Sequence, residues 1–318
     1  MPLIVSRPAG GVYTPPVVAP DPYVPLFPPL DTTRPTAVYI DPTGVEWPLS
    51  DPGLGWATID EVDGLGAVEY ELSTDPHPRG GSRVRHSQPV SRIVNWPLLV
   101  WGDTHVEFLA RWRALARAFT LSRRLTLPPG RLRVYRPDGS AREILVRYQG
   151  GFKGEPGYGF TEDTAIAVLY AEDPYWRDVA PVTLSYGTAA PRRFLSPFPS
   201  VSSGNVLGEA EVWNPGDAEA WPEWTLTGPC DGITATNHTT GEAFTLTYPL
   251  AAGQTVTITT EPPTVRGPAG QVLTWALNWP GAVLWGLAPG PNDVDFAVTG
   301  TQPGTAVDLS FVSRYETA

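Results

Sequence analysis

The chain has 318 residues with a formal net charge of −11, and 42% of its residues are hydrophobic. This length exceeds what one hydrophobic core usually organises, so two domains are expected, and the apolar fraction excludes a disordered chain. The single cysteine, Cys230, excludes an intrachain disulfide and a cysteine-rich zinc site. No signal peptide and no apolar run near the ~20 residues of a membrane span is visible, so we expect no membrane insertion.

Charge is distributed unevenly along the chain. Residues 79–153 carry 15 basic and 4 acidic side chains, whereas residues 178–318 carry 4 basic and 13 acidic ones. All but one of the 22 basic residues are arginines, which pair bidentately with carboxylates at protein interfaces as well as with phosphates. The basic stretch is therefore either an assembly surface or a solvated face with ion pairs inside one domain.

The first 35 residues form a proline-rich arm. They contain ten prolines, interleaved with Tyr13, Tyr23, Leu26 and Phe27. Proline at this density enforces an extended backbone and excludes helix. The apolar anchors favour an arm that lies along a surface, with a disordered tail as the alternative.

Residues 36–177 then carry a strand pattern. Segments 36–40 and 45–49 predict a hairpin around the turn Asp41-Pro42-Thr43-Gly44. Residues 91–101 predict a strand, which Pro97 restricts to an edge or a bulge. Further strands are expected at 125–127, 131–136, 142–148 and 164–171, and Pro137-Asp138-Gly139-Ser140 predicts a hairpin turn between the second and third of them.

One helix is predicted, over residues 104–119. Thr104 and Glu107 have the spacing of a capping box, which satisfies the first free backbone amides. Apolar residues recur at steps of three and four, namely Phe108, Leu109, Trp112, Leu115, Ala116 and Phe119. Three arginines lie off this stripe, at Arg111, Arg113 and Arg117. We expect the apolar face to pack on a sheet.

The last third of the chain predicts a second domain. Residues 178–208 lack a sustained period and are rich in Pro, Ser and Gly, which predicts a linker. From 209 to 318, Thr alternates with Val, Ile, Leu or Phe, which indicates an antiparallel β-sandwich. Strands are expected at 210–214, 223–228, 242–248, 254–260, 272–279, 282–288, 293–300 and 306–315. The predicted fold class is mainly β with one α-helix, with a β-rich domain at 36–177 and a sandwich at 209–318.

The sequence nominates no catalytic centre. A hydrolase needs a nucleophile elbow, a carboxylate pair or a metal cluster, and none of these patterns is present. The glycine-rich residues 150–159 lack the Gly-Lys-Ser/Thr of a phosphate loop and predict a hairpin tip instead. We predict that the protein is not an enzyme and has no catalytic residue, metal ligand or cofactor. A polysaccharide hydrolase is the weakest alternative.

Six of the twelve tryptophans fall in the last 110 residues. Most are expected in the core of the sandwich, because they keep step with the apolar alternation. Trp221 and Trp279, each next to a proline, are the candidates for exposure. Exposed indoles stack on the flat apolar face of a pyranose, so the alternative function is a carbohydrate-binding module or adhesin that contacts host surface glycans.

Three groups of segments point to one protein family. The helix EFLARWRALARAF is followed by RVYRPDGSAREILVRYQGG, AVLYAEDPYW comes next, and the second domain contains LGEAEVWNPGDAEAWPEWTLTGP and LWGLAPGPNDV. Together they resemble the distal tail (Dit) proteins of long-tailed, siphovirus-type bacteriophages, known as minor tail proteins in phages that infect actinobacteria. The match extends from about residue 36 to the end, and AVLYAEDPYW is its most specific part.

The resemblance implies a homo-hexameric ring at the distal end of the virion tail. The first domain would form the belt, and a galectin-like sandwich would project outward. The implied partners are the tail tube protein, the tail-tip hub protein and the tape measure protein, without membrane insertion or sequence-specific nucleic-acid binding. The candidate assembly contacts are Arg111, Arg113, Arg117, Asp173, Tyr175 and Trp176. For the last three, closure of the domain core is the alternative.

Overall fold

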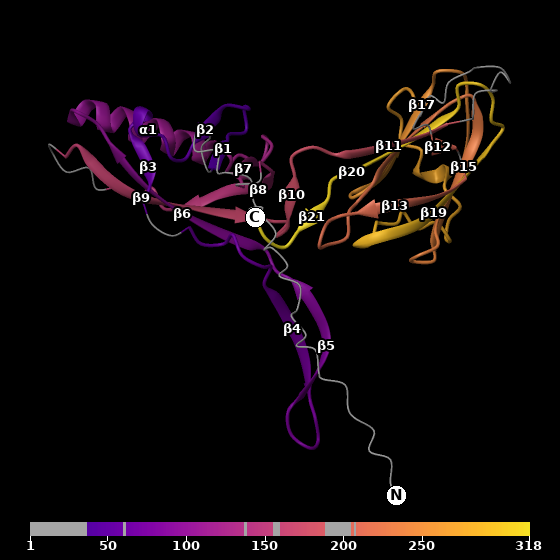
Figure 1. Cartoon of the computed structure of the whole chain (residues 1–318), viewed down its shortest axis with the longest axis horizontal. Helices are drawn as coiled ribbons and strands as arrows, with labels where there is room; N and C mark the ends of the chain where they lie inside the picture. The colour runs from indigo at the N-terminus through magenta and orange to yellow at the C-terminus, as the bar shows by residue number, and fades with distance from the viewer. Residues whose placement is uncertain (1–36, 60–61, 137–138, 155–159, 188–204, 207) are drawn as a thin grey trace, which may run out of the picture.

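The computed structural model describes residues 37–59, 62–136, 139–154, 160–187, 205–206 and 208–318. Within these ranges the chain is mainly β with a single α-helix, which confirms the predicted fold class. A sheet covered by the helix forms the first unit, a two-sheet sandwich forms the second, and a two-stranded hairpin projects away from both (Figure 1). The proline-rich arm expected at 1–35 lies outside the described residues.

The first unit is built on an antiparallel sheet. Its strands are β1 (Ala37–Ile40), β2 (Glu46–Pro48), β3 (Trp56–Thr58), β6 (Arg92–Trp101), β7 (Gly130–Tyr135), β8 (Ala141–Gly150), β9 (Glu162–Ala171) and β10 (Trp176–Asp178), and a short 3₁₀ turn spans Pro52–Leu54. The strand order is β2-β1-β7-β8-β9-β6-β3, with β10 beside β8. Both predicted hairpins are present, because β1 pairs with β2 and β7 with β8. Strand β6 lies between β9 and β3 without a bulge, so the prediction that Pro97 restricts it to an edge or a bulge is wrong. Pro97 faces Ile59 just beyond the end of β3, so its missing N–H interrupts no ladder.

The helix α1 (His105–Leu121) covers one face of this sheet (Figure 1). The Thr104 hydroxyl accepts a hydrogen bond from the backbone N–H of Glu107 at 3.2 Å, and the Glu107 carboxylate accepts one from the N–H of Asp103 at 3.0 Å. The buried residues of the helix are Phe108, Trp112, Leu115, Ala118 and Phe119. The predicted cap and face are therefore confirmed, except that Leu109 and Ala116 are only partly buried.

The strand predicted at 125–127 is wrong. These residues form turns, and the Leu125 side chain is 82% exposed. Backbone bonds of the i to i+3 type continue from the helix end through the N–H of Leu127. Pro128 and Pro129 follow at once and cannot donate to a sheet ladder, so the chain reaches β7 without forming another strand.

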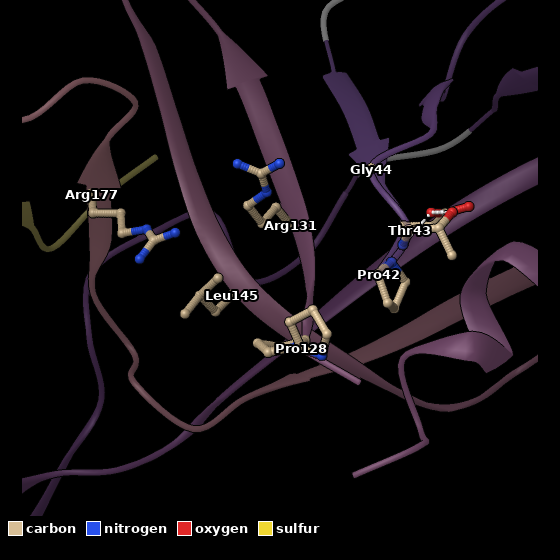
Figure 2. Close-up of a pocket in the computed structure, with 9 residues that line it drawn as sticks. Pro42, Thr43, Gly44, Pro128, Arg131, Leu145 and Arg177 are labelled. Atoms are coloured by element: carbon tan, nitrogen blue, oxygen red, sulfur yellow. Dashed lines mark hydrogen bonds between the residues drawn. The ribbon is translucent and has the colours of Figure 1, made fainter. Parts of the chain in front are cut away.

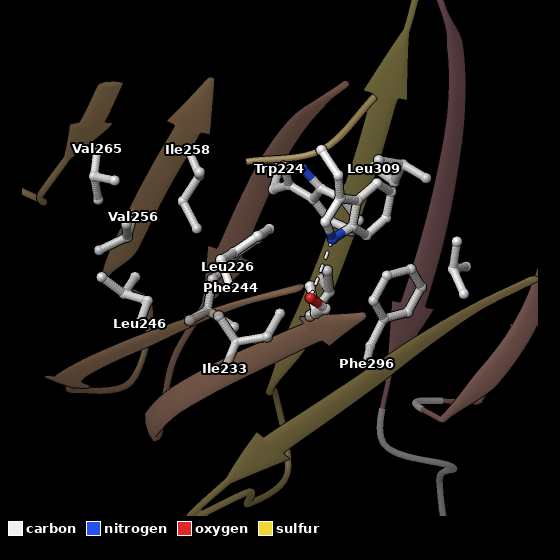
Figure 3. Close-up of a cluster of buried hydrophobic side chains, with 14 of the residues drawn as sticks. Trp224, Leu226, Ile233, Phe244, Leu246, Val256, Ile258, Val265, Phe296 and Leu309 are labelled. Atoms are coloured by element: carbon white, nitrogen blue, oxygen red, sulfur yellow. Dashed lines mark hydrogen bonds between the residues drawn. The ribbon is translucent and has the colours of Figure 1, made fainter. Parts of the chain in front are cut away.

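The second unit is a sandwich of two sheets. Its strands are β11 (Val182–Gly187), β12 (Asn205–Val206), β13 (Glu209–Asn214), β14 (Glu223–Thr227), β15 (Cys230–Asn237), β16 (Glu242–Leu250), β17 (Thr255–Thr260), β18 (Pro263–Arg266), β19 (Gly290–Thr299) and β20 (Ala306–Phe311). One sheet has the order β12-β11-β20-β14-β17-β18 and the other β13-β19-β15-β16. The core between them is centred on Trp224, which contacts Phe244, Phe296 and Trp285 edge to face (Figure 3).

Several predictions for this half of the chain need correction. Residues 182–187, inside the expected linker, form β11 and pair along their whole length with β20. Their alternation of Val182, Leu184 and Tyr186 with polar residues carries the strand signal. The strands expected at 272–279 and 282–288 are a 3₁₀ turn (Thr274–Ala276) and irregular chain, whereas β15 and β18 were not predicted. Residues 188–204 of the expected linker lie outside the described residues.

The chain ends by crossing back from the sandwich to the first unit. Strand β21 (Arg314–Tyr315) pairs with β10, and the last residue, Ala318, is 1% exposed in the core of the first unit (Figure 1). The backbone N–H of Ala318 donates to the carbonyl of Leu65 at 3.0 Å. Residues 312–315, expected to extend a strand of the sandwich, thus belong to the junction between the units.

The projecting hairpin consists of β4 (Tyr70–Pro76) and β5 (Ser82–Pro89). These two strands were not predicted from the sequence. Nearly every residue of both strands is exposed, and among the described residues these two strands form a sheet of their own. Figure 1 shows the hairpin extending well beyond the first unit.

Candidate functional site

The three arginines of α1 lie in different environments. Arg111 is bound within the first unit, because its guanidinium donates to the carbonyl of Trp101 at 2.8 Å and pairs with the Glu107 carboxylate at 2.7 Å. Arg113 and Arg117 are exposed, and within the described part of the chain their guanidinium groups make no ion pair or hydrogen bond. Of the three candidates, Arg113 and Arg117 therefore remain accessible to another subunit.

The residues Asp173, Tyr175 and Trp176 are placed at the junction between the units. The Trp176 side chain is completely buried in the core of the first unit. This position agrees with the alternative that the residue closes the domain core. Asp173 pairs with Arg314 at 2.7 Å, and the Arg314 guanidinium lies 4.4 Å from the centre of the Tyr175 ring. Arg314 also donates to the carbonyl of Glu219 in the sandwich at 2.9 Å. The exposed part of the motif thus binds the returning C-terminal segment of the same chain.

Arg92 holds this junction from inside. It is 7% exposed, and its guanidinium donates four hydrogen bonds of 2.7 Å to backbone carbonyls. The acceptors belong to Gly64, Gly66, Pro174 and Glu316, so three separated segments meet at one side chain. Burial lowers the pKa of Arg92, and the carbonyls compensate for the lost hydration. Arg92 could not be predicted from the sequence, because a lone arginine on a strand carries no local signal.

A second arginine group lies on the sheet around the buried Glu143. Its carboxylate pairs with Arg177 at 2.8 Å, with Arg133 at 3.1 Å and more distantly with Arg131 at 3.9 Å. One negative charge therefore faces three positive ones. Arg131 and Arg177 line an open pocket of about 470 Å³ (Figure 2).

The floor of this pocket is apolar and its rim carries one carboxylate. Leu145 and Pro128 contribute apolar surface, and the rim is the turn that begins at Asp41 (Figure 2). The Asp41 carboxylate is occupied by the turn itself, since it accepts hydrogen bonds from Thr43 and from the Trp47 indole. The lining thus combines two guanidinium groups with one carboxylate, because these hydrogen bonds leave the charge of Asp41 in place.

The exposed hairpin is amphipathic. Tyr70, Leu72 and Val84 lie on one face and are 43%, 54% and 51% exposed. Asp75 and Arg85 form an ion pair on the hairpin. At the base, the hydroxyl of Tyr70 lies 3.0 Å from that of Tyr175, and this contact raises the pKa of Tyr70. The hairpin is thus anchored at the junction and offers an uncovered apolar face.

Four tryptophans of the sandwich are exposed. Trp221 and Trp279, the two candidates from the sequence, are 37% and 57% exposed. Trp213 and Trp275 are 59% and 71% exposed and were missed. Trp213 lies on the outward-facing positions of β13, and Trp275 lies in a segment that is not a strand. The assumption of strand alternation placed Trp275 in the core.

The described residues contain neither a metal-holding cluster nor a helix that could cross a membrane. Among them, no group of three or more His, Cys, Asp or Glu side chains is arranged to hold a metal ion. Cys230 is buried, which raises the pKa of its thiol. No helix in the described ranges is both long and apolar enough to cross a bilayer.

Comparison with known proteins relates the fold to phage tail tips. No protein-family model matches the sequence, and no curated protein shows significant similarity to it. Among solved structures, the Dit protein of phage SPP1, described as a paradigm of the hub adsorption apparatus in phages that infect Gram-positive bacteria, matches with a TM-score of 0.61 and 14% identity over 88% of this chain and 98% of that chain. Two chains from the activated baseplate of phage P2, solved with Ca and with Sr, match with TM-scores of 0.52 and 9% identity over 89% of this chain and 98% and 99% of theirs. The chain thus has the fold of phage Dit and baseplate proteins.

Proposed function

We propose that this chain is a structural protein of a bacteriophage virion, a distal tail protein that forms a hexameric ring between the tail tube and the tail-tip hub. The observation that carries the proposal is the match to the SPP1 Dit protein, which covers 88% of this chain and 98% of the other. Both units and their order are included in a match of this extent. The function is one of assembly and is not enzymatic.

The hairpin β4–β5 supplies the principal ring contact in this proposal. An isolated two-stranded hairpin is only marginally stable in water, so its exposed apolar face requires a covering surface. The first unit of the next copy provides that surface, and the closed ring repeats the same contact around its axis. Arg113 and Arg117 add charge pairing across the contact, in keeping with the basic character of residues 79–153.

The remaining partners follow from the ring. The belt faces the tail tube protein on one side and the hub protein, with the tape measure protein, on the other. The sandwich, which carries a net charge of −9 over residues 178–318 (4 basic and 13 acidic), projects outward. The similarity of AVLYAEDPYW to minor tail proteins supports a siphovirus of an actinobacterial host.

Light scattering on the purified chain tests the ring, at two salt concentrations and over a range of protein concentrations. A hexamer of the 34.4 kDa chain has a mass of about 206 kDa (six times 34.4). Leu72→Glu with Val84→Glu, at exposed positions, is expected to give a folded monomer because it places charge on the covered face. Val272→Glu, at a 59% exposed position of the sandwich, is the matched control and keeps the ring.

A wild-type monomer under every condition, also in the presence of tail tube protein, would contradict the ring. A ring that survives the double substitution would show that the hairpin is not its contact. Circular dichroism of both variants establishes that the fold is retained.

A further inference from the structure

The segment between β18 and β19 closes one side of the sandwich. It begins on the edge of one sheet, where the N–H of Leu273 donates to the carbonyl of Val265 at 2.8 Å. It then reaches the edge of the other sheet, where the N–H of Asn278 donates to the carbonyl of Thr245 at 3.0 Å. No charged side chain occurs from residue 267 to residue 292, a range that includes the whole segment and the start of β19. The segment is thus a neutral surface on a domain that is otherwise acidic.

This segment divides its apolar side chains between the core and the solvent. Leu273, Ala276, Leu277, Ala282 and Trp285 are buried in the core of the sandwich. The outward side chains are Val272, Trp275, Trp279 and Val283, which are 59%, 71%, 57% and 43% exposed. Because the inward side chains fix the backbone, the outward ones cannot turn into the core. The two indoles are therefore displayed by a rigid support.

Hydrogen bonds orient Trp279 and the neighbouring Asn278. The Trp279 N–H donates to the carbonyl of Thr274 at 2.7 Å, which satisfies the indole and fixes its ring. The Asn278 Oδ1 accepts a hydrogen bond from the N–H of Thr245 at 2.8 Å, which orients the exposed amide. Asn278 is exposed and precedes Trp279 in the chain, and the exposed Thr247 follows Leu246, which forms an antiparallel bridge with Leu277, so both side chains supply hydrogen-bonding groups on this edge.

We propose that Trp275 and Trp279 form a binding platform for neutral carbohydrate. The C–H face of a pyranose stacks on an indole face, and its hydroxyls bond to amide and hydroxyl groups at the rim. The absence of charge from residue 267 to 292 matches an uncharged ligand, and the net charge of −9 over residues 178–318 disfavours anionic glycans. This site is independent of ring formation.

Affinity electrophoresis of the full chain tests the platform in native gels that contain dextran, mannan or arabinogalactan, with polygalacturonate as the anionic probe. We expect at least one neutral polysaccharide to retard the wild type. Trp275→Ala and Trp279→Ala each weaken the retardation about tenfold, the change that corresponds to ~1.4 kcal/mol, and the double variant migrates freely. Trp213→Ala is the matched control, because Trp213 is as exposed as Trp279 but lies on β13, and it changes retardation less than twofold.

Three results would overturn the proposal. The first is a wild type that none of the neutral polysaccharides retards, and the second is a double variant that is retarded like the wild type. The third is a double variant whose mass, measured by light scattering, is lower than that of the wild type, together with a wild type that no polysaccharide retards. That result would assign the two tryptophans to a protein contact. Because both indoles are more than half exposed, the fold is retained, and thermal unfolding of each variant checks this.

Discussion

Replacement of Arg92 by lysine tests whether one side chain holds the two units together. Arg92→Lys keeps the positive charge. It replaces the planar guanidinium, which donates to four carbonyls, by an ammonium at the end of a shorter side chain. The carbonyls lie on residues 64–66, on Pro174 and on Glu316, which approach the guanidinium from different directions. A single ammonium nitrogen can take the place of Nη1, which donates to Gly64 and Gly66, but it cannot also reach the acceptors of Nε and Nη2, so two bonds are lost.

The magnitude follows from the bonds that are lost. A hydrogen bond from a charged donor stabilises by roughly 1.5–3 kcal/mol, and two or more are removed. Three of the four bonds are only partly buried, so solvent replaces part of the loss. We expect the free energy of unfolding to fall by about 3 kcal/mol. Arg113→Lys, at an exposed position, changes it by less than about 0.5 kcal/mol.

Urea unfolding of both variants measures the difference, with hydrogen exchange to locate it. The lysine variant is expected to lose amide protection first in β10 and β21, since these strands join the units. A loss of less than about 1 kcal/mol, or a loss of protection spread evenly over the sandwich, would refute the assignment of Arg92 as the residue that holds the junction.

Two further predictions concern the first unit. Gly151 has φ +114°, and a Cβ added there would lie 1.5 Å from the carbonyl oxygen of Ile166. Gly151→Ala is therefore expected to destabilise the fold by about 2–4 kcal/mol, measured by thermal unfolding. Gly150→Ala is the control and should be near neutral, because the space around Gly150 is open. Burial of Asp41 opposes its ionisation, but hydrogen bonds outweigh this and lower its pKa below the ordinary 3.8. Its ionised form therefore stabilises the fold above pH 3.8, and this contribution is lost as the pH falls through the lowered pKa. Asp41→Asn should cost about 1–2 kcal/mol at pH 7 and progressively less below pH 3.8, and a cost that does not change with pH in urea titrations would contradict this.

The candidate site was predictable in part. The helical period separates Arg111, Arg113 and Arg117 from the core face, but it cannot show that Arg111 binds the carbonyl of Trp101 within its own unit. The motif around Asp173 stands out in the sequence, yet its partner Arg314 lies 141 residues away. The hairpin escaped prediction because exposed strands lack the alternation that one buried face imposes.

Features that depend on neighbouring residues follow from the sequence alone. The capped helix, the hairpins β1–β2 and β7–β8 and the β character of the second unit arise from local dihedral preferences and periodicity. Which side of residues 272–288 is buried, and where the last residues lie, depends instead on tertiary contacts. The burial of residues 272–288 depends on bonds to the edges of two sheets, and the position of the last residues depends on the backbone carbonyls that Arg92 binds. In both cases the contacting residues lie far apart in the chain.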